Sequence, residues 1–338
     1  MKPREKTGIA LLALLLGIAA CVSLSSGRYP ISPSAAIRAL RIAWTDPVMA
    51  ESDPAAVVLL SLRLPRLLAC ILVGAGLSAS GACYQAVFRN PMADPGLLGV
   101  SAGAACGAAI GILFTDSIQA TQALSFLGGL AAVLLASGLW FLVREEGEAS
   151  VSLILCGLVV NATFTALLSL AKFSADPYSK LPALTTWLMG GFSGISFSDL
   201  HRAAWLFPPA LLGFWLVRTR IDALALGEDD ARSLGARPGL SRAVAVCSST
   251  LLVAASVSLC GILGWVGVLV PHMARFVLGP RFSVLLPGSI LAGAAYLLFA
   301  DTLCRSLFPL EVPLGIATSL AGAPAFALLL RRNRRGWA

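Results

Sequence analysis

Charged residues are scarce in this chain. Only 12% of its 338 residues are Asp, Glu, Lys or Arg, about half the usual globular share, while 57% are apolar. A soluble protein of this length needs far more polar surface to enclose its core. The composition therefore excludes an ordinary soluble enzyme, a disordered tail protein and a nucleic-acid-binding domain. It indicates an all-α polytopic membrane protein.

Residues that would hold a nucleotide or a metal are also missing. The chain has no GxxxxGK[ST] motif, and its only two histidines, His201 and His272, have no partner at ligand spacing. We expect no catalytic residues, no metal site and no cofactor bound by this chain. The eight cysteines lie within or at the edge of apolar runs without a CxxC pair. They are interpreted as small packing residues.

Ionisable side chains are absent from the interiors of the apolar runs. Ion-coupled carriers need such groups within the membrane to bind an ion or relay protons. Asp301 and Arg305 lie only near the end of one run. Energy for any transport is therefore expected to come from another subunit.

The uncharged runs predict about ten spanning helices, each of roughly 20 residues. A 29-residue run, 243–271, contains Gly261, Gly264 and Gly267 and is predicted to divide there into two helices, the second reaching about Leu278. The other predicted spans are 7–26, 67–88, 96–115, 117–143, 149–171, 203–217, 282–300 and 312–330. The whole chain, 1–338, is interpreted as one transmembrane domain.

The first run admits two interpretations. Thr7–Ser26 is long enough to span, but the basic residues before it and the sequence Ile18–Cys21 resemble a lipoprotein signal. We favour a retained first helix. With ten spans both termini share one side. Placing both inside puts sixteen of the 25 Lys and Arg residues on the cytoplasmic side, as the positive-inside rule predicts.

Three connecting segments are too long for simple turns. The outer segment 27–62 is predicted to contain a surface helix at 34–44, and the outer segment 172–201 a short helix that does not span. The inner loop, about 218–242, contains the sequence GEDDARSLGAR at 227–237. Its acidic start and its glycine and proline end predict a short surface helix.

The segment RNPMADPGLLGVSAGAACG at 89–107 predicts a turn over Asn90–Pro95, because Asn-Pro and Asp-Pro break helices. Glycines then recur at 96, 99, 103 and 107 on one helix face. Such a stripe permits close helix contact. Tight packing and the lining of a moving pathway both remain open.

Three further motifs each admit two interpretations. Asn161, Thr165 and Ser169 share one helix face and could line a pathway or bond a neighbouring helix. In WVGVLVPHMAR at 265–275, Pro271 and His272 indicate either a kinked helix end or a proton or metal role. RLPR at 63–66 could anchor the chain at the membrane surface or dock an acidic partner.

Together these motifs resemble the permease subunit of FecCD-like ABC importers for iron–siderophore complexes, haem and vitamin B12. The resemblance runs from RLPR at 63 to GAPAF at 322–326. The motifs that carry it are RNPMADPGLLGVSAGA (89–104), WLMGGFSGISFSDL (187–200), LGEDDARSLGA (226–236), GILGWVGVLVPHMARFVLGP (261–280), LFADTLCR (298–305) and EVPLGIATSLAGAPAF (311–326).

The resemblance implies a bundle like that of the vitamin B12 importer permease, in the cytoplasmic membrane of a prokaryote. It also implies a homodimer, two cytoplasmic ATPase subunits that bind ATP and Mg²⁺, and an extracytoplasmic binding protein. Arginines at the positions of Arg63, Arg66 and Arg305 pair with glutamates of the binding protein in that family. An ion-coupled secondary carrier is the alternative function, and a non-transporting receptor or assembly protein is a third.

Two further groups of residues are assigned roles. ATPase coupling is predicted through the inner loop, at Leu226, Gly227, Glu228, Asp229, Arg232, Leu234 and Gly235. Small and hydroxyl side chains suit a wide, weakly interacting conduit for large cargo. The translocation pathway is therefore predicted along Ser101, Gly103, Asn161, Thr165, Thr318 and Ser319. Binding specificity is expected to lie largely with the binding protein.

Overall fold

The structure is a computed structural model that describes residues 2–27, 29, 31–45, 49, 52–143, 149–307 and 310–332. Within these residues the regular structure is helical, without a strand. The elements of the first half are α1 (Pro3–Ser25), α2 (Pro33–Thr45), α4 (Pro54–Val57), the π-helical turn η1 (Val58–Arg63), α5 (Leu64–Val87), α6 (Val100–Phe114), α7 (Ile118–Val143) and α8 (Ala149–Ser174). Those of the second half are α9 (Lys180–Leu188), α10 (Phe197–Ala204), α11 (Phe207–Leu224), α12 (Glu228–Ser233), α13 (Pro238–Cys260), α14 (Val266–Leu278), α15 (Phe282–Ser306) and α16 (Leu314–Arg332).

Ten helical segments correspond to the ten predicted spans. Six of them are long and apolar enough to cross a membrane: α1, the run Pro54–Val87, α7, α8, α13 and α15. Three shorter apolar helices, α6, α14 and α16, and the 18-residue α11 complete the set. The all-α polytopic fold is confirmed.

The long apolar run divides where its glycines predicted. α13 ends at Cys260 and α14 begins at Val266 and ends at Leu278. Gly261 adopts φ +72°, and a Cβ there would lie 2.3 Å from the carbonyl oxygen of Trp187. Only glycine fits such a close backbone approach, so the chain leaves the helix at this point.

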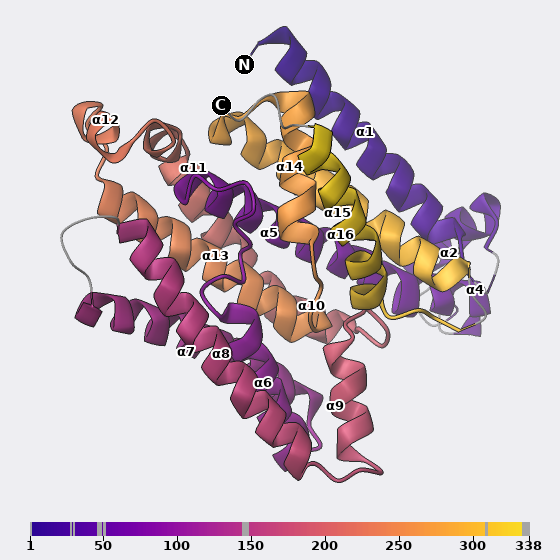
Figure 1. Ribbon diagram of the computed structural model, residues 1–338. Coiled ribbons are helices and arrows are strands. Elements are labelled where there is room, and N and C mark those ends of the chain that lie inside the picture. The colour runs from indigo at the N-terminus through magenta and orange to yellow at the C-terminus, as the bar shows by residue number, and fades with distance from the viewer. Residues whose placement is uncertain are drawn as a thin grey trace.

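The core of the bundle is α5, which packs against α13, α14 and α15. Two glycine contacts bring the backbones together: a Cβ on Gly74 would lie 2.3 Å from the oxygen of Gly293, and one on Gly81 only 1.7 Å from that of Gly267. α6, α7 and α8 form a second group, and α1 lies along α15 and α14 (Figure 1).

The two ends of the bundle differ. The start of α1, the end of α16 and the short helix α12 lie at one end, whereas α2, α4 and α9 lie toward the other (Figure 1). The first described helix therefore begins, and the last described helix ends, at the same end of the bundle, as an even number of spans requires. The predicted surface helix at 34–44 is α2. The segment 172–201 contains α9 and the start of α10, two short helices where one was predicted.

Candidate functional site

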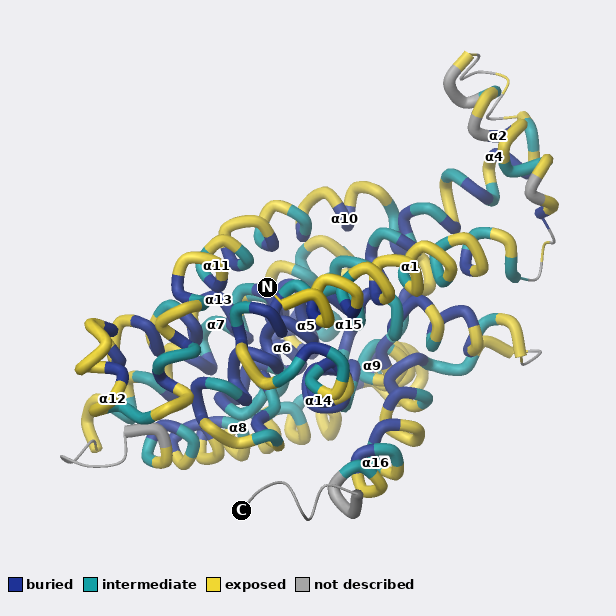
Figure 2. The backbone as a smooth tube through the Cα atoms, turned by 90° about the horizontal axis from the view of Figure 1, so that it is seen from above, coloured by how far each residue is buried: buried dark blue, intermediate teal, exposed yellow. Residues whose placement is uncertain are grey.

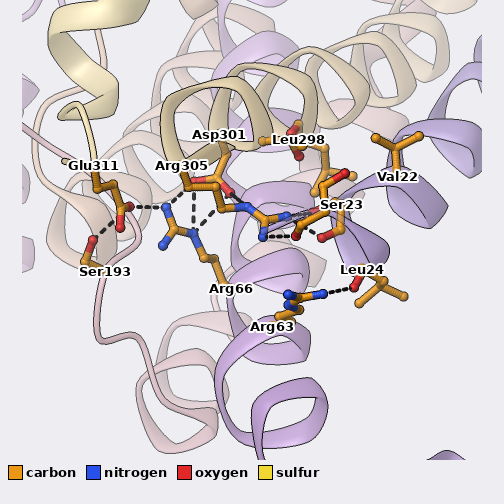
Figure 3. A network of polar contacts seen from close by, with 12 residues as sticks. Val22, Ser23, Leu24, Arg63, Arg66, Ser193, Leu298, Asp301, Arg305 and Glu311 are labelled. Carbon is orange, nitrogen blue, oxygen red and sulfur yellow. Dashed lines mark hydrogen bonds and ion pairs between the residues drawn. The ribbon is translucent and has the colours of Figure 1, made fainter. Parts of the chain in front are cut away.

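An ion cluster centred on the buried Asp301 joins α5 to the end of α15 and to the segment before α16. Arg66 donates from Nη2 to Oδ1 of Asp301 at 2.7 Å and from Nε to Oδ2 at 3.1 Å. It also bonds Glu311, which accepts from Ser193 Oγ at 3.0 Å (Figure 3). Asp301 is 1% exposed. The paired geometry of a guanidinium and a carboxylate makes this the strongest polar contact of the region.

The other two arginines hold the end of α1. Arg63 donates to the carbonyl oxygens of Leu24 and Tyr29. Arg305 donates to Ser26 O at 2.6 Å and to Ser23, and its Nε lies 3.4 Å from Asp301 Oδ2, as expected for a carboxylate one turn earlier (Figure 3). The three arginines predicted to dock a partner are thus brought together, and each also binds within the chain.

The helix that contains the second predicted span begins earlier than expected. The span was predicted to begin at Leu67, but the helical run extends from Pro54 to Val87 and passes through Arg63 and Arg66. Asp53 caps its start, since the carboxylate accepts from the amide of Ala56 at 3.2 Å. The helix extends through the arginines because other helices supply partners for their charges.

A cavity of about 850 Å³ lies beside this cluster, between the α6–α7 turn, α9 and the segments that follow α9 and α15. Lys180 and Asp116 form an ion pair of 2.8 Å at its edge. Asp199 also borders it. Burial raises the pKa of Asp199, but hydrogen bonds from Ser196 and Gln122 and the charge of Arg202 outweigh burial and leave that pKa lowered.

At the opposite end, α12 is a single helical turn closed by a glycine. Gly235 adopts φ +78°, its amide donates to Arg232 O at 2.9 Å, and the amide of Ala236 donates to Ala231 O at 2.9 Å. This is the Schellman arrangement. The small contact between Ala231 and Ala236, packed with Leu224, attaches α12 to the bundle.

The charges of α12 are paired mostly within the helix. Arg232 bonds Glu228 at 3.0 Å and Asp229 at 2.7 Å, and Glu228 also bonds Arg242 of α13. Leu226 and Leu234, at either end, are 65% and 67% exposed. The predicted coupling residues thus present apolar side chains beside a fixed set of charges.

A further contact that the sequence did not suggest links α12 to the Asn-Pro turn. Arg89 adopts φ +48° and its Nε donates to Leu224 O at 3.0 Å. A Cβ on Gly227 would lie 3.2 Å from the Arg89 guanidinium. The loop after α5 therefore supports the loop before α12. In the sequence, only the Arg-Asn-Pro motif at 89–91 could have indicated this contact.

The polar face of α8 is exposed on the isolated chain. Thr165 donates to Asn161 O at 2.7 Å and Ser169 donates to Thr165 O at 2.9 Å. Both hydroxyls are therefore satisfied within α8 and do not bond a neighbouring helix. Figure 2 shows α8 and α16 along one side of the bundle, with α10 and α11 along the other.

The remaining predicted pathway residues differ in exposure. Ser319 is exposed, Ser101 and Asn161 are half-buried, and Thr318 is 1% exposed. Gly103 is buried against α7, where a Cβ would lie 2.3 Å from the oxygen of Gly128. Gly103 and Gly107 pack α6 on α7, whereas Gly96 and Gly99 precede α6, so the four glycines do not share one helix face as predicted. The role of Gly103 in lining a pathway stays a prediction.

His272 lies in an apolar setting within α14. The centroid of its ring lies 5.4 Å from that of Phe276 and 5.8 Å from that of Phe326, and both ring pairs pack edge to face. Among the residues that the structure describes, no group of three His, Cys, Asp or Glu side chains could hold a metal ion. Pro271 and His272 lie in the middle of α14, which runs from Val266 to Leu278, so the predicted helix end does not fall at these residues.

Comparisons with known proteins identify the family. Residues 14–332 match the model of the FecCD transport family. This chain belongs to that family. The molybdate import system permease protein of Haemophilus influenzae is 36% identical over 96% of this chain and 95% of its own. A Helicobacter pylori protein ascribed to iron chelatin transport as a permease is 39% identical, over 84% of this chain and 85% of its own.

The fold agrees with this assignment. A solved inward-facing structure, ascribed to a metal-chelate type ABC transporter, superposes with a TM-score of 0.85, covering 96% of this chain and 98% of that one at 34% identity. Permeases named for hemin and for vitamin B12 are also similar. This FecCD chain is therefore a multi-pass permease subunit of an ABC importer. The assignment favours the importer over the ion-coupled carrier that the sequence left as an alternative.

Proposed function

We propose that this FecCD permease works as a homodimer with two cytoplasmic ATPase subunits and an extracytoplasmic binding protein. The observation that carries the proposal is the match over almost the whole chain to the inward-facing ABC transporter. ATP and Mg²⁺ would be bound by the ATPase subunits, and this chain would supply no catalytic residue. Purification of the complex from a cytoplasmic membrane should give two permease chains with two ATPase subunits. A permease that purifies as a functional monomer would contradict the proposal.

We place both termini and α12 on the cytoplasmic side. The preponderance of Lys and Arg in the segments at that end supports this orientation. A phosphatase reporter active only outside the cytoplasm should be silent when fused after residue 235 and active when fused after residue 195. The opposite result would invert the topology.

ATPase coupling would run through α12. Leu226 and Leu234 offer two exposed apolar contacts, and the Glu228–Arg232–Arg242 pairs hold the turn between them in one shape. A rigid turn seated in a groove of the ATPase converts its closure into movement of α11 and α13. The pairing of α12 charges within the chain supports recognition of an apolar groove rather than a charged one.

Docking of the binding protein would use Arg63, Arg66 and Arg305. The structure changes how this is tested, because a carboxylate at position 63 would face the carbonyls of α1. Arg63→Gln is the cleaner variant: Arg63 has no carboxylate partner among the described residues. We expect weaker association with the binding protein, with the loss largest at low salt. Arg38→Gln, on the exposed side of α2, is the matched control. Equal binding by both variants would remove Arg63 from the docking site.

Translocation would follow the exposed face of α8 between two copies of the chain. Cys21 and Cys247 are the exposed native thiols among the eight and are replaced first. Thr165→Cys should then react with a water-soluble thiol reagent in at least one nucleotide state, whereas Ser125→Cys, which is buried, should not. Protection of residue 165 in every state would exclude α8 as a pathway helix.

For the cargo we propose an iron–siderophore complex, with haem or cobalamin as alternatives. The similar proteins are named for molybdate, iron chelatin, hemin and vitamin B12 at comparable identities, so identity alone does not choose among them. Molybdate is a further candidate, because a permease named for its import matches 96% of this chain. ATP hydrolysis by the assembled complex with its binding protein is measured against each ligand in turn. Stimulation by molybdate alone would replace the iron–siderophore assignment.

A further inference from the structure

The carboxyl end of α1 is capped only in part by its own residues: Ser25 Oγ and the amide of Ser26 donate to Val22 O, at 3.1 and 2.8 Å, which leaves the later carbonyls without a donor from α1. The last carbonyls of any helix have no partner within it, and α1 has no basic residue in its last turn. Arg63 and Arg305, from two other helices, supply the missing donors to Leu24 and to Ser23 and Ser26 (Figure 3). The two arginines therefore form a clasp on the end of α1.

Gly27 makes room for this clasp. It adopts φ +143°, and a Cβ there would lie 2.9 Å from Arg305 Nη1 and 2.9 Å from Arg63 Nη2. A side chain at this position would meet both guanidinium groups at once and would strain the backbone. The chain at Gly27 is thus shaped to let both arginines reach the carbonyls.

The arginines of this region outnumber the carboxylates that pair with them. Arg66 is paired with Asp301 and Glu311, and Arg305 reaches Asp301 only at 3.4 Å. Among the described residues of this cluster, three guanidinium groups face two carboxylates, which leaves one positive charge in excess. Arg63 is bonded to neutral carbonyl oxygens. Since a bond to a carboxylate is roughly twice as strong as one to a carbonyl, an incoming carboxylate can replace these carbonyls.

We propose that the end of α1, residues 23–27, is part of the docking site as an internal competitor for Arg63 and Arg305. Carboxylates of the binding protein would displace the α1 carbonyls, so docking would free the end of α1. This inference rests on the proposed docking function and adds to it a segment that moves when the partner binds. The end of α1 also gives both arginines hydrogen-bond partners while no binding protein is present.

The first experiment opens the clasp without changing an arginine. Gly27→Ala should release both guanidinium groups and tighten association with the binding protein by about threefold to tenfold, the equivalent of one lost hydrogen bond. Gly17→Ala, within α1 itself, is the control, because a Cβ there meets nothing within 4 Å. Unchanged or weaker binding by Gly27→Ala, with the complex assembled normally, would overturn the proposal.

The second experiment leaves the clasp intact. A spin label at Ser25→Cys, in a chain whose exposed Cys21 and Cys247 are replaced, reports the mobility of the α1 end. Adding binding protein should raise this mobility, while a label at Thr7→Cys, near the other end of α1, should not change. An unchanged Ser25 label with salt-sensitive association would refute the clasp and leave docking in place. Association that does not depend on salt would refute arginine docking itself.

Discussion

The arginine cluster around Asp301, at the end of the bundle proposed to face outward and called the outer cluster, and the helix α12, at the end proposed to face the cytoplasm, are both rich in charge, yet they use it in opposite ways. The outer arginines join segments far apart in sequence: Arg66 reaches Asp301, and Arg305 reaches Ser23. In α12, Arg232 pairs with residues three and four positions away. The outer cluster is buried, whereas Asp229 of α12 is 98% exposed in its side chain.

This difference separates two ways of preparing a surface for a partner. Buried ions at the outer end hold three helices together, so any partner that binds them must compete with contacts already made. The exposed pairs of α12 contribute little to stability and leave Leu226 and Leu234 free to be covered. The charges of the outer cluster thus stabilise the fold, whereas the charges of α12 stabilise only the short helix that is proposed to contact the ATPase.

The largest expected effect is that of Asp301→Ala. Removing this carboxylate leaves Arg66 with Glu311 alone and Arg305 without its ion pair, both in a buried setting. Breaking such a pair by deleting one partner costs about 3–5 kcal/mol. Thermal unfolding in detergent should show a large fall in the midpoint. Asp229→Ala on α12 is the contrasting variant and should unfold as the parent does. Equal effects would abolish the distinction between the two ends.

The sequence predicted those features whose cause is local. The break at 261–267 follows from glycines in an uncharged run, and α12 follows from its acidic start and Gly235. The long helix through Arg63 and Arg66 was not predicted. A charged residue beside an apolar run indicates the end of a spanning helix, unless residues elsewhere in the chain pair with its charge. Those partners are distant in the sequence: Asp301 lies 235 residues after Arg66, and the carbonyl of Leu24 lies 39 residues before Arg63. Gly103 and Gly107 identified a contact face but not its partner, α7.

The next effect concerns association rather than folding. Leu226→Ala together with Leu234→Ala removes the exposed apolar contacts of α12, each worth about 1.5–3 kcal/mol when buried against a partner. We expect the ATPase subunit to be lost on purification, with thermal unfolding of the permease unchanged. Leu212→Ala and Leu216→Ala, exposed on α11, are the matched pair. Retention of the ATPase by the α12 variant would show that coupling does not use these leucines.

A smaller effect is expected for Gly235→Ala. No atom lies within 4 Å of the added Cβ, so the substitution tests backbone conformation alone. At φ +78° an L side chain costs about 1–2 kcal/mol. The turn after α12 should loosen, and the assembled complex should show less substrate-stimulated ATP hydrolysis. Gly239→Ala, with similar open space and no positive φ, controls for the added methyl. Full coupling in Gly235→Ala would argue against a rigid α12.

The smallest effect is expected for Arg232→Ala. Its two ion pairs lie within one helical turn, and its side chain is 58% exposed, so solvent screens both. Pairs of this kind stabilise a helix by about 0.3–0.5 kcal/mol, close to the limit of measurement. Arg242→Ala should cost more, because that side chain is 10% exposed and its removal leaves Glu228 without its tie to α13. The two variants are compared by thermal unfolding and by ATPase retention at low and high salt. A larger loss of stability for Arg232→Ala would mean that α12, like the outer cluster, holds the fold together through its charges.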